Sequence, residues 1–197
     1  MRRHSTGSRI VGPPAYDRDM RLHAASSVLC VIDVQEKLLP VIAAGEAVVA
    51  AAGRLADAAR ILDVPAILTE QYPRGLGPTR ATLAGKLPPP LEKRAFSCCG
   101  CDDFVAAIPA ERHQVVLAGL ETHVCVAQTA LDLLGRGNAV FVAVDAVAAR
   151  HAIDHEVALR RLEAAGAVLT TSEAVLFEWC RSADHPRFQA VRRLVTG

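Results

Sequence analysis

The sequence predicts a three-layer α/β/α domain with a mainly parallel, doubly wound sheet. Short apolar runs, typical of strands buried on both faces of a parallel sheet, recur along the chain. Longer helical patterns lie between them, and several of these patterns close on glycine. Strands that alternate with helices in this way form parallel sheets through right-handed crossovers.

The strands are predicted from continuous apolar runs. These runs cover residues 28–32, 65–69, 114–119, 139–144 and 167–170. The first ends at Asp33 and the fourth at Asp145. In an open parallel sheet, ligands bind outside the carboxyl ends of the strands, so residues that follow these runs are candidates for a site.

Helices are predicted between the strands. An Ala-rich helix covers roughly residues 45–62, and others cover 124–134 and 155–165. An apolar helix face is expected within 173–181, as core or as a subunit contact. Two stretches interrupt the pattern: 71–79, rich in Pro and Gly, is expected to be an ordered loop, and 87–90 a stiff connector.

The chain is predicted to hold one domain. Residues 1–25 are polar and are expected to form a loosely ordered extension, with a single domain over 26–197. The extension lacks the apolar run of a secretory signal, and no stretch approaches the ~20 apolar residues of a membrane span. A cytoplasmic protein with no membrane partner is therefore expected.

Composition also limits the function. The net charge of +1 gives no general attraction to nucleic acid, and an aromatic content of 4% does not favour a base-stacking platform. The six cysteines lie in a chain that is neither short nor loop-rich, so free thiols in a reducing compartment are expected. No nucleic-acid partner is predicted.

Three side chains are the candidates for chemistry. Cys125 precedes a predicted helix, where partial positive charge favours the reactive thiolate, although a lone cysteine is more often a small core residue. Asp33 ends the first strand and can serve as a base, or only as a cap. Lys93 follows the stiff connector and can stabilise both the thiolate of Cys125 and the carboxylate of Asp33, or simply be a solvated surface lysine.

The chain resembles the isochorismatase-like cysteine hydrolases, and in particular the isochorismatase domain-containing branch. The matching pieces occur in the family's order: VIDVQ at 31–35, TEQYPRGLG at 69–77, EK at 92–93 with FS at 96–97, GLETHVCV at 119–126, TSE at 171–173 with LF at 176–177, and HPRF at 185–188. Together they extend from about residue 26 to the C-terminus. Any one of these pieces alone would be weak evidence for the family, but the full set is specific to it.

The resemblance implies a catalytic triad of Asp33, Lys93 and Cys125, acting without a cofactor. It also implies a cis peptide between Leu120 and Glu121, which would turn the backbone N–H groups of Glu121 and Cys125 towards an oxyanion. Family members are commonly oligomeric, so a homo-oligomer is expected. The Asp-x-His metal site of the nicotinamidase branch has no counterpart after Thr69, so no metal is predicted.

Further residues are expected near the pocket. Gln35, Gln71 and Tyr72 are candidates for polar contacts with a substrate, and Phe96 for an apolar wall, although each also has an ordinary loop-packing explanation. The cluster Cys98-Cys99-Gly100-Cys101 lacks the two separated pairs of a structural zinc site, so we interpret it as a thiol-rich loop.

The predicted function is cysteine-dependent hydrolysis of a C–N bond in a small amide or related small molecule, through a covalent thiol intermediate. Vinyl-ether hydrolysis of an isochorismate-like substrate is the alternative reaction. A catalytically silent oligomeric scaffold and a thiol redox role of the 98–101 cluster are the alternatives from other classes.

Overall fold

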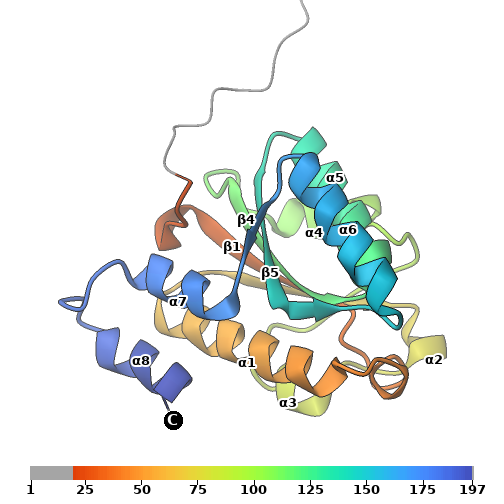
Figure 1. Ribbon diagram of the computed structural model, residues 1–197, viewed down its shortest axis with the longest axis horizontal. Coiled ribbons are helices and arrows are strands. Elements are labelled where there is room, and N and C mark those ends of the chain that lie inside the picture. The colour runs from red at the N-terminus through yellow and green to blue at the C-terminus, as the bar shows by residue number, and fades with distance from the viewer. Residues whose placement is uncertain (1–19, 197) are drawn as a thin grey trace, which may run out of the picture.

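A computed structural model describes residues 20–196 and confirms the three-layer α/β/α fold (Figure 1). The described residues form one six-stranded sheet in which every neighbouring pair is parallel. The order across the sheet is β3-β2-β1-β4-β5-β6. Its strands are β1 (Ser27–Ile32), β2 (Ala66–Gln71), β3 (Leu91–Lys93), β4 (Gln114–Leu120), β5 (Ala139–Ala148) and β6 (Val168–Thr170).

The strand order reverses direction between β1 and β4. From β1 the chain proceeds outward through β2 to β3, and from β4 it proceeds the opposite way through β5 to β6. The connections that leave the carboxyl ends of β1 and β4 therefore diverge, and in open α/β sheets such a point is where ligands bind. Asp33 follows β1 and Cys125 follows β4, so the topology brings these two residues to the same point.

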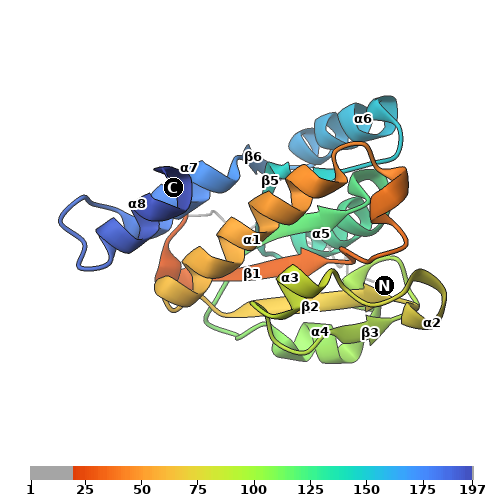
Figure 2. The same cartoon turned by 90° about the horizontal axis from the view of Figure 1, so that it is seen from below.

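Helices cover both faces of the sheet, as Figures 1 and 2 show. On one face lie α1 (Gly45–Ile61), α3 (Ala81–Ala84), α7 (Ser172–Cys180) and α8 (Phe188–Thr196). On the other lie α4 (Asp102–Ala107), α5 (Ala127–Gly135) and α6 (Ala152–Ala164). The short helix α2 (Pro73–Leu76) lies in the segment predicted to be an ordered loop.

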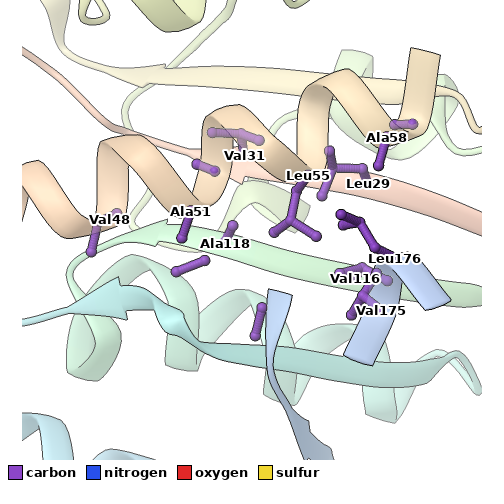
Figure 3. Packing of buried hydrophobic residues seen from close by; sticks show 14 of the residues in the cluster. Leu29, Val31, Val48, Ala51, Leu55, Ala58, Val116, Ala118, Val175 and Leu176 are labelled. Carbon is purple, nitrogen blue, oxygen red and sulfur yellow. The ribbon is translucent and has the colours of Figure 1, made fainter. Parts of the chain in front are cut away.

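The core is divided between the two faces of the sheet. Side chains of successive strand residues point to opposite faces, so Leu29 and Val31 of β1 pack with α1 while Cys30 and Ile32 pack on the side of α5. Figure 3 shows Leu55 of α1 among the first set. Because both faces are covered, all six residues of β1 are buried, which explains the uninterrupted apolar run from Val28 to Ile32.

Several element boundaries differ from those predicted. The strand expected to end at Asp145 continues to Ala148. Its Asp145 carboxylate accepts hydrogen bonds from the backbone N–H and the hydroxyl of Ser172, at the start of α7. Strand β3 and helices α2, α3, α4 and α8 were not predicted from the sequence. They are short, or their residues carry only part of a periodic pattern.

Residues 1–19 of the predicted N-terminal extension lie outside the described part of the chain. Residues 20–25 lead into the domain. Leu22 is buried, and its N–H donates to Glu178 at 2.7 Å. The N–H of His23 donates to the side chain of Gln114 at 2.7 Å. Within residues 20–196, no helix has the length and apolar character needed to cross a membrane.

Candidate active site

A buried ion pair lies at the carboxyl ends of β1 and β3. Nζ of Lys93 donates to Oδ2 of Asp33 at 2.7 Å, and both side chains are almost completely inaccessible to solvent. Burial is the largest single effect and lowers the pKa of Lys93, but the Asp33 charge, the neighbouring Cys98 and Cys125, and the hydrogen bond to Asp33 together outweigh it. The pKa is therefore raised, and the ammonium stays protonated at neutral pH. The site thus retains a fixed positive charge.

Strand register brings Lys93 to this position. Strand β3 pairs with β2 so that Lys93 lies opposite Gln71. The ammonium contacts Oε1 of Gln71 at 2.8 Å and the backbone carbonyl of Phe96 at 3.0 Å, in addition to the Asp33 carboxylate. Its three protons therefore have acceptors, as a buried cation requires.

Cys125 lies on a π-helical turn, η4 (Thr122–Val126), that joins β4 to α5. The residue is 6% exposed. Burial is the largest cause of a strongly raised pKa of the Cys125 thiol, followed by the negative charge of Asp33, while the positive charge of Lys93 lowers it by less. The helix N-terminus was expected to favour the thiolate, but Cys125 lies within the π-turn, buried beside a carboxylate, and both of these effects favour the thiol instead.

The peptide bond between Leu120 and Glu121 is cis, as the family resemblance implied. It directly precedes the turn that carries Cys125. The Glu121 carboxylate accepts hydrogen bonds from Arg150, from the backbone N–H at 2.9 Å and from Nε at 3.1 Å. The Glu121 side chain is thus held by the segment that follows β5, and its backbone carbonyl accepts hydrogen bonds from the N–H groups of Val124 and Val126 in the turn.

The residues predicted to contact substrate divide into two pairs. Gln35 is fully buried: its amide donates to the carbonyls of Gln71 and Gly77 and accepts from the Gln71 N–H. Gln71 contacts Lys93 and the Arg94 carbonyl. Both amides are thus engaged within the protein.

Tyr72 and Phe96 form the second pair and are 40% and 54% exposed. The Arg94 guanidinium lies 4.0 Å above the centre of the Tyr72 ring. A cleft of about 330 Å³ beside Lys93 is lined by Tyr72, Pro73, Arg74, Glu92, Lys93 and Arg94. Contact of these four predicted residues with a substrate stays a prediction.

The sequence did not predict that Thr69 contacts the ion pair, and it placed Cys98 only in a thiol-rich loop by the pocket. Thr69 is 1% exposed, and its hydroxyl donates to Oδ1 of Asp33 at 2.8 Å. The buried thiol of Cys98 lies 3.8 Å from the same hydroxyl. Burial, the largest cause, raises the pKa of Cys98 to about 11. The two residues occur within motifs already noted, but nothing in the sequence shows that they lie against Asp33.

The 98–101 cluster forms no disulfide, and all six cysteines are free thiols. Cys98 and Cys99 are buried, while Cys101 is half-buried. Among residues 20–196, no three His, Cys, Asp or Glu side chains lie close enough together to hold a metal ion.

The parallel sheet, with this group of residues at its switch point, defines a protein of the isochorismatase-like hydrolase fold. Residues 27–174 match the model of the Isochorismatase domain family, and the chain belongs to this family. Isochorismatase domain-containing protein 2A of Mus musculus is 41% identical over 175 residues, which cover 89% of this chain and 85% of the mouse protein. The resemblance drawn from the motifs is thereby confirmed.

Solved structures similar over most of the chain include the following three. MAR1 ribonuclease from Caenorhabditis elegans has a TM-score of 0.84 and 42% identity, and the match covers 90% of this chain and 93% of the ribonuclease. YcaC from Pseudomonas aeruginosa, solved with hexane-2,5-diol and covalent acrylamide, has a TM-score of 0.80 and 30% identity, and the match covers 87% of this chain and 89% of YcaC. The YcaC gene product of Escherichia coli, an octameric hydrolase of unknown specificity, has a TM-score of 0.78 and 28% identity, and the match covers 89% of this chain and 95% of that protein.

Proposed function

We propose that this protein is a cysteine hydrolase that cleaves a C–N bond in a small amide through a covalent thioester. The observation that carries the proposal is the buried pair of Asp33 and Lys93 beside Cys125, at the point where the strand order reverses. A nucleophile, a base and a fixed cation at one place are the parts that covalent acyl transfer needs.

In the first half of the proposed reaction, Asp33 accepts the thiol proton while the sulfur of Cys125 attacks the amide carbonyl. A C–S bond forms, and the carbonyl electron pair moves to oxygen. The backbone N–H groups of Glu121 and Cys125 are proposed to stabilise that oxyanion. The C–N bond then breaks, the proton on Asp33 passes to the leaving nitrogen, and a thioester remains.

In the second half, water attacks the thioester and gives a proton to Asp33. The C–S bond breaks, the carboxylic acid leaves, and the proton on Asp33 returns to the sulfur. Because the Cys125 pKa is raised, the thiolate forms only as the proton moves to Asp33. Lys93 keeps its charge throughout and stabilises the carboxylate and the developing thiolate. No cofactor takes part.

A relative supports a reactive nucleophile in this fold. The P. aeruginosa YcaC structure contains covalently bound acrylamide, a small unsaturated amide. For this chain we propose that Tyr72 and Phe96 provide apolar surface beside the site, since both are exposed. The alternatives are vinyl-ether hydrolysis, a silent scaffold and a thiol redox role. Cysteine labelling and substrate turnover separate them from amide hydrolysis.

The first test is limiting iodoacetamide at neutral pH, followed by peptide mapping. We expect Cys125 to be alkylated fastest, and Asp33→Ala and Lys93→Ala to slow its labelling. Buried Cys30 and Cys180 serve as internal controls within the same sample. If Cys125 labels no faster than they do in folded protein, the hydrolase proposal fails and the scaffold alternative gains support. Reversible pairing of Cys98, Cys99 and Cys101 would instead favour the redox alternative.

The second test is a panel of small aliphatic and aromatic amides, with ammonia or amine release as the readout. Activity that disappears in Cys125→Ala supports C–N hydrolysis. The panel includes an isochorismate-like vinyl ether and RNA, because the C. elegans relative is described as a ribonuclease. Turnover of the vinyl ether or of RNA by wild type but not by Cys125→Ala, without amide turnover, would contradict the amide assignment.

We also propose that the protein forms a homo-oligomer. The E. coli relative is octameric. Ile153 and Val157, one turn apart on α6, remain 60% and 46% exposed in a single chain. Sedimentation velocity is expected to give a mass several times that of one 20.9 kDa chain. A single-chain mass at micromolar concentration contradicts this proposal.

A further inference from the structure

Strand β2 lies between the two strands whose ends carry the buried ion pair. In the order β3-β2-β1, Lys93 belongs to β3 and Asp33 follows β1. Thr69 and Gln71 are two residues apart on β2, so their side chains point to the same face of the sheet. Each reaches one member of the ion pair.

Thr69 contacts the carboxylate. Its hydroxyl donates to Oδ1 of Asp33 at 2.8 Å, while Lys93 holds Oδ2 at 2.7 Å. The Asp33 backbone N–H also donates to the Thr69 carbonyl, at 3.2 Å. The same hydroxyl also lies 3.8 Å from the buried Cys98 sulfur. Both carboxylate oxygens thus have a fixed donor in a region closed to solvent.

Gln71 contacts the ammonium. Its Oε1 accepts from Lys93 at 2.8 Å, and its Nε2 donates to the Arg94 carbonyl at 2.8 Å. The Gln71 N–H is itself bound by Oε1 of Gln35 at 2.8 Å. With both ends of its amide engaged, Gln71 is oriented towards Lys93.

We propose that Thr69 and Gln71 are positioning residues of the hydrolase site: Thr69 orients the Asp33 carboxylate, and Gln71 orients the Lys93 ammonium. This inference rests on the proposed function, and it gives Gln71 a role in addition to its predicted contact with substrate. A carboxylate with one oxygen fixed by a cation and the other by a hydroxyl cannot rotate, so it presents a constant direction to the Cys125 thiol.

A hydroxyl that only fills space would act differently from one that orients a base. If Thr69 acts as proposed, removing its hydroxyl leaves Oδ1 of Asp33 without its donor, and the carboxylate is no longer held in one direction. A variant that keeps the hydroxyl but loses the methyl group then retains the rate. Loss of packing alone would slow both variants alike.

The test measures the rate of Cys125 alkylation at neutral pH. Thr69→Val, which keeps the shape, is expected to lower the rate about tenfold. Thr69→Ser, which keeps the hydroxyl, is expected to retain most of the wild-type rate. Thr79→Val is the matched control, because the Thr79 hydroxyl also donates to a buried carboxylate, that of Glu70, at 2.7 Å.

Gln71 is tested with the same small reagent, so that substrate binding does not contribute. Gln71→Met removes the acceptor for Lys93 and is expected to slow alkylation about tenfold, whereas Gln71→Glu keeps that acceptor and retains most of the rate. These variants also provide an independent result if Thr69→Val fails to fold.

Several outcomes overturn the inference. A wild-type rate in Thr69→Val and Gln71→Met would do so, as would equal losses in Thr69→Val and Thr69→Ser. In both cases rapid wild-type labelling of Cys125 leaves the proposed function intact. Slow labelling of Cys125 in the wild type removes the proposed function itself, and the two failures are therefore distinguishable.

Discussion

Gly119 of β4 lies against Ile32 of β1 with no space for a side chain between them. A Cβ atom on Gly119 would fall 2.0 Å from the Ile32 carbonyl oxygen, and the Gly119 φ angle is +123°. This contact occurs at the junction of the two central strands, one residue before Asp33 on β1 and close to the turn that carries Cys125 on β4. The absence of a side chain here lets the segments that carry Asp33 and Cys125 start side by side.

Gly119→Ala is therefore expected to destabilise the protein by more than about 4 kcal/mol, because backbone atoms must separate in addition to the strain at positive φ. Chemical denaturation measures the loss. Gly137→Ala is the matched control: its φ is +89°, but an added Cβ meets nothing within 4 Å. That control is expected to cost about 1–2 kcal/mol. Equal losses in the two variants would show that backbone strain alone, and not the contact with Ile32, sets the effect.

Breaking the ion pair of Asp33 and Lys93 is expected to be costly for stability as well as for activity. Lys93→Met leaves the Asp33 carboxylate buried without its cation, and we expect a loss of about 3–5 kcal/mol. Asp33→Asn combined with Lys93→Met removes both charges, and Asn tolerates the positive φ at residue 33. The double variant is expected to be more stable than the sum of the single losses implies, while Cys125 labelling stays slow. Strict additivity would contradict coupling between the two charges.

The sequence predicted the positions of Asp33 and Cys125 better than those of Lys93 and Thr69. Asp33 and Cys125 follow long apolar strands, so strand periodicity and the rule on carboxyl ends place both at one edge. The position of Lys93 was harder to predict, because β3 has only three residues and follows a run of prolines. The family resemblance was needed to single this lysine out. The contact of Thr69 with Asp33 depends on strand register between segments 36 residues apart, which no local pattern encodes.

Gln35 is expected to matter mainly by holding the 71–79 segment beside the site. Gln35→Met would leave its backbone partners at Gln71 and Gly77 unpaired in a buried region, with an expected loss of about 2–4 kcal/mol. Faster hydrogen exchange confined to residues 72–78 would report the loosened segment. The exposed Gln128→Met serves as control and is expected to change stability by less than about 0.5 kcal/mol. Unchanged exchange in Gln35→Met would contradict this role.

Buried thiols are expected to make the protein lose stability in alkaline solution. Burial is the largest cause of a raised pKa at Cys30, Cys98, Cys99, Cys125 and Cys180. A thiol ionises near pH 8.5 once it is exposed in the unfolded chain, but at higher pH in the folded protein. Above about pH 8.5 the unfolded state therefore binds fewer protons than the native state, so the free energy of unfolding falls as pH rises.

The measurement is urea denaturation at several pH values between 7 and 10, about the range in which free thiols titrate, with a non-thiol reductant present. Each thiol that ionises only in the unfolded chain contributes a slope of up to about 1.4 kcal/mol per pH unit. Cys30→Ala removes one such group, fully buried in β1. It is expected to be less stable than the wild type at pH 7 but to lose less stability between pH 8.5 and 10, where that thiol would titrate. A pH-independent difference between the two proteins would show that the Cys30 thiol has the same pKa in the folded and unfolded states.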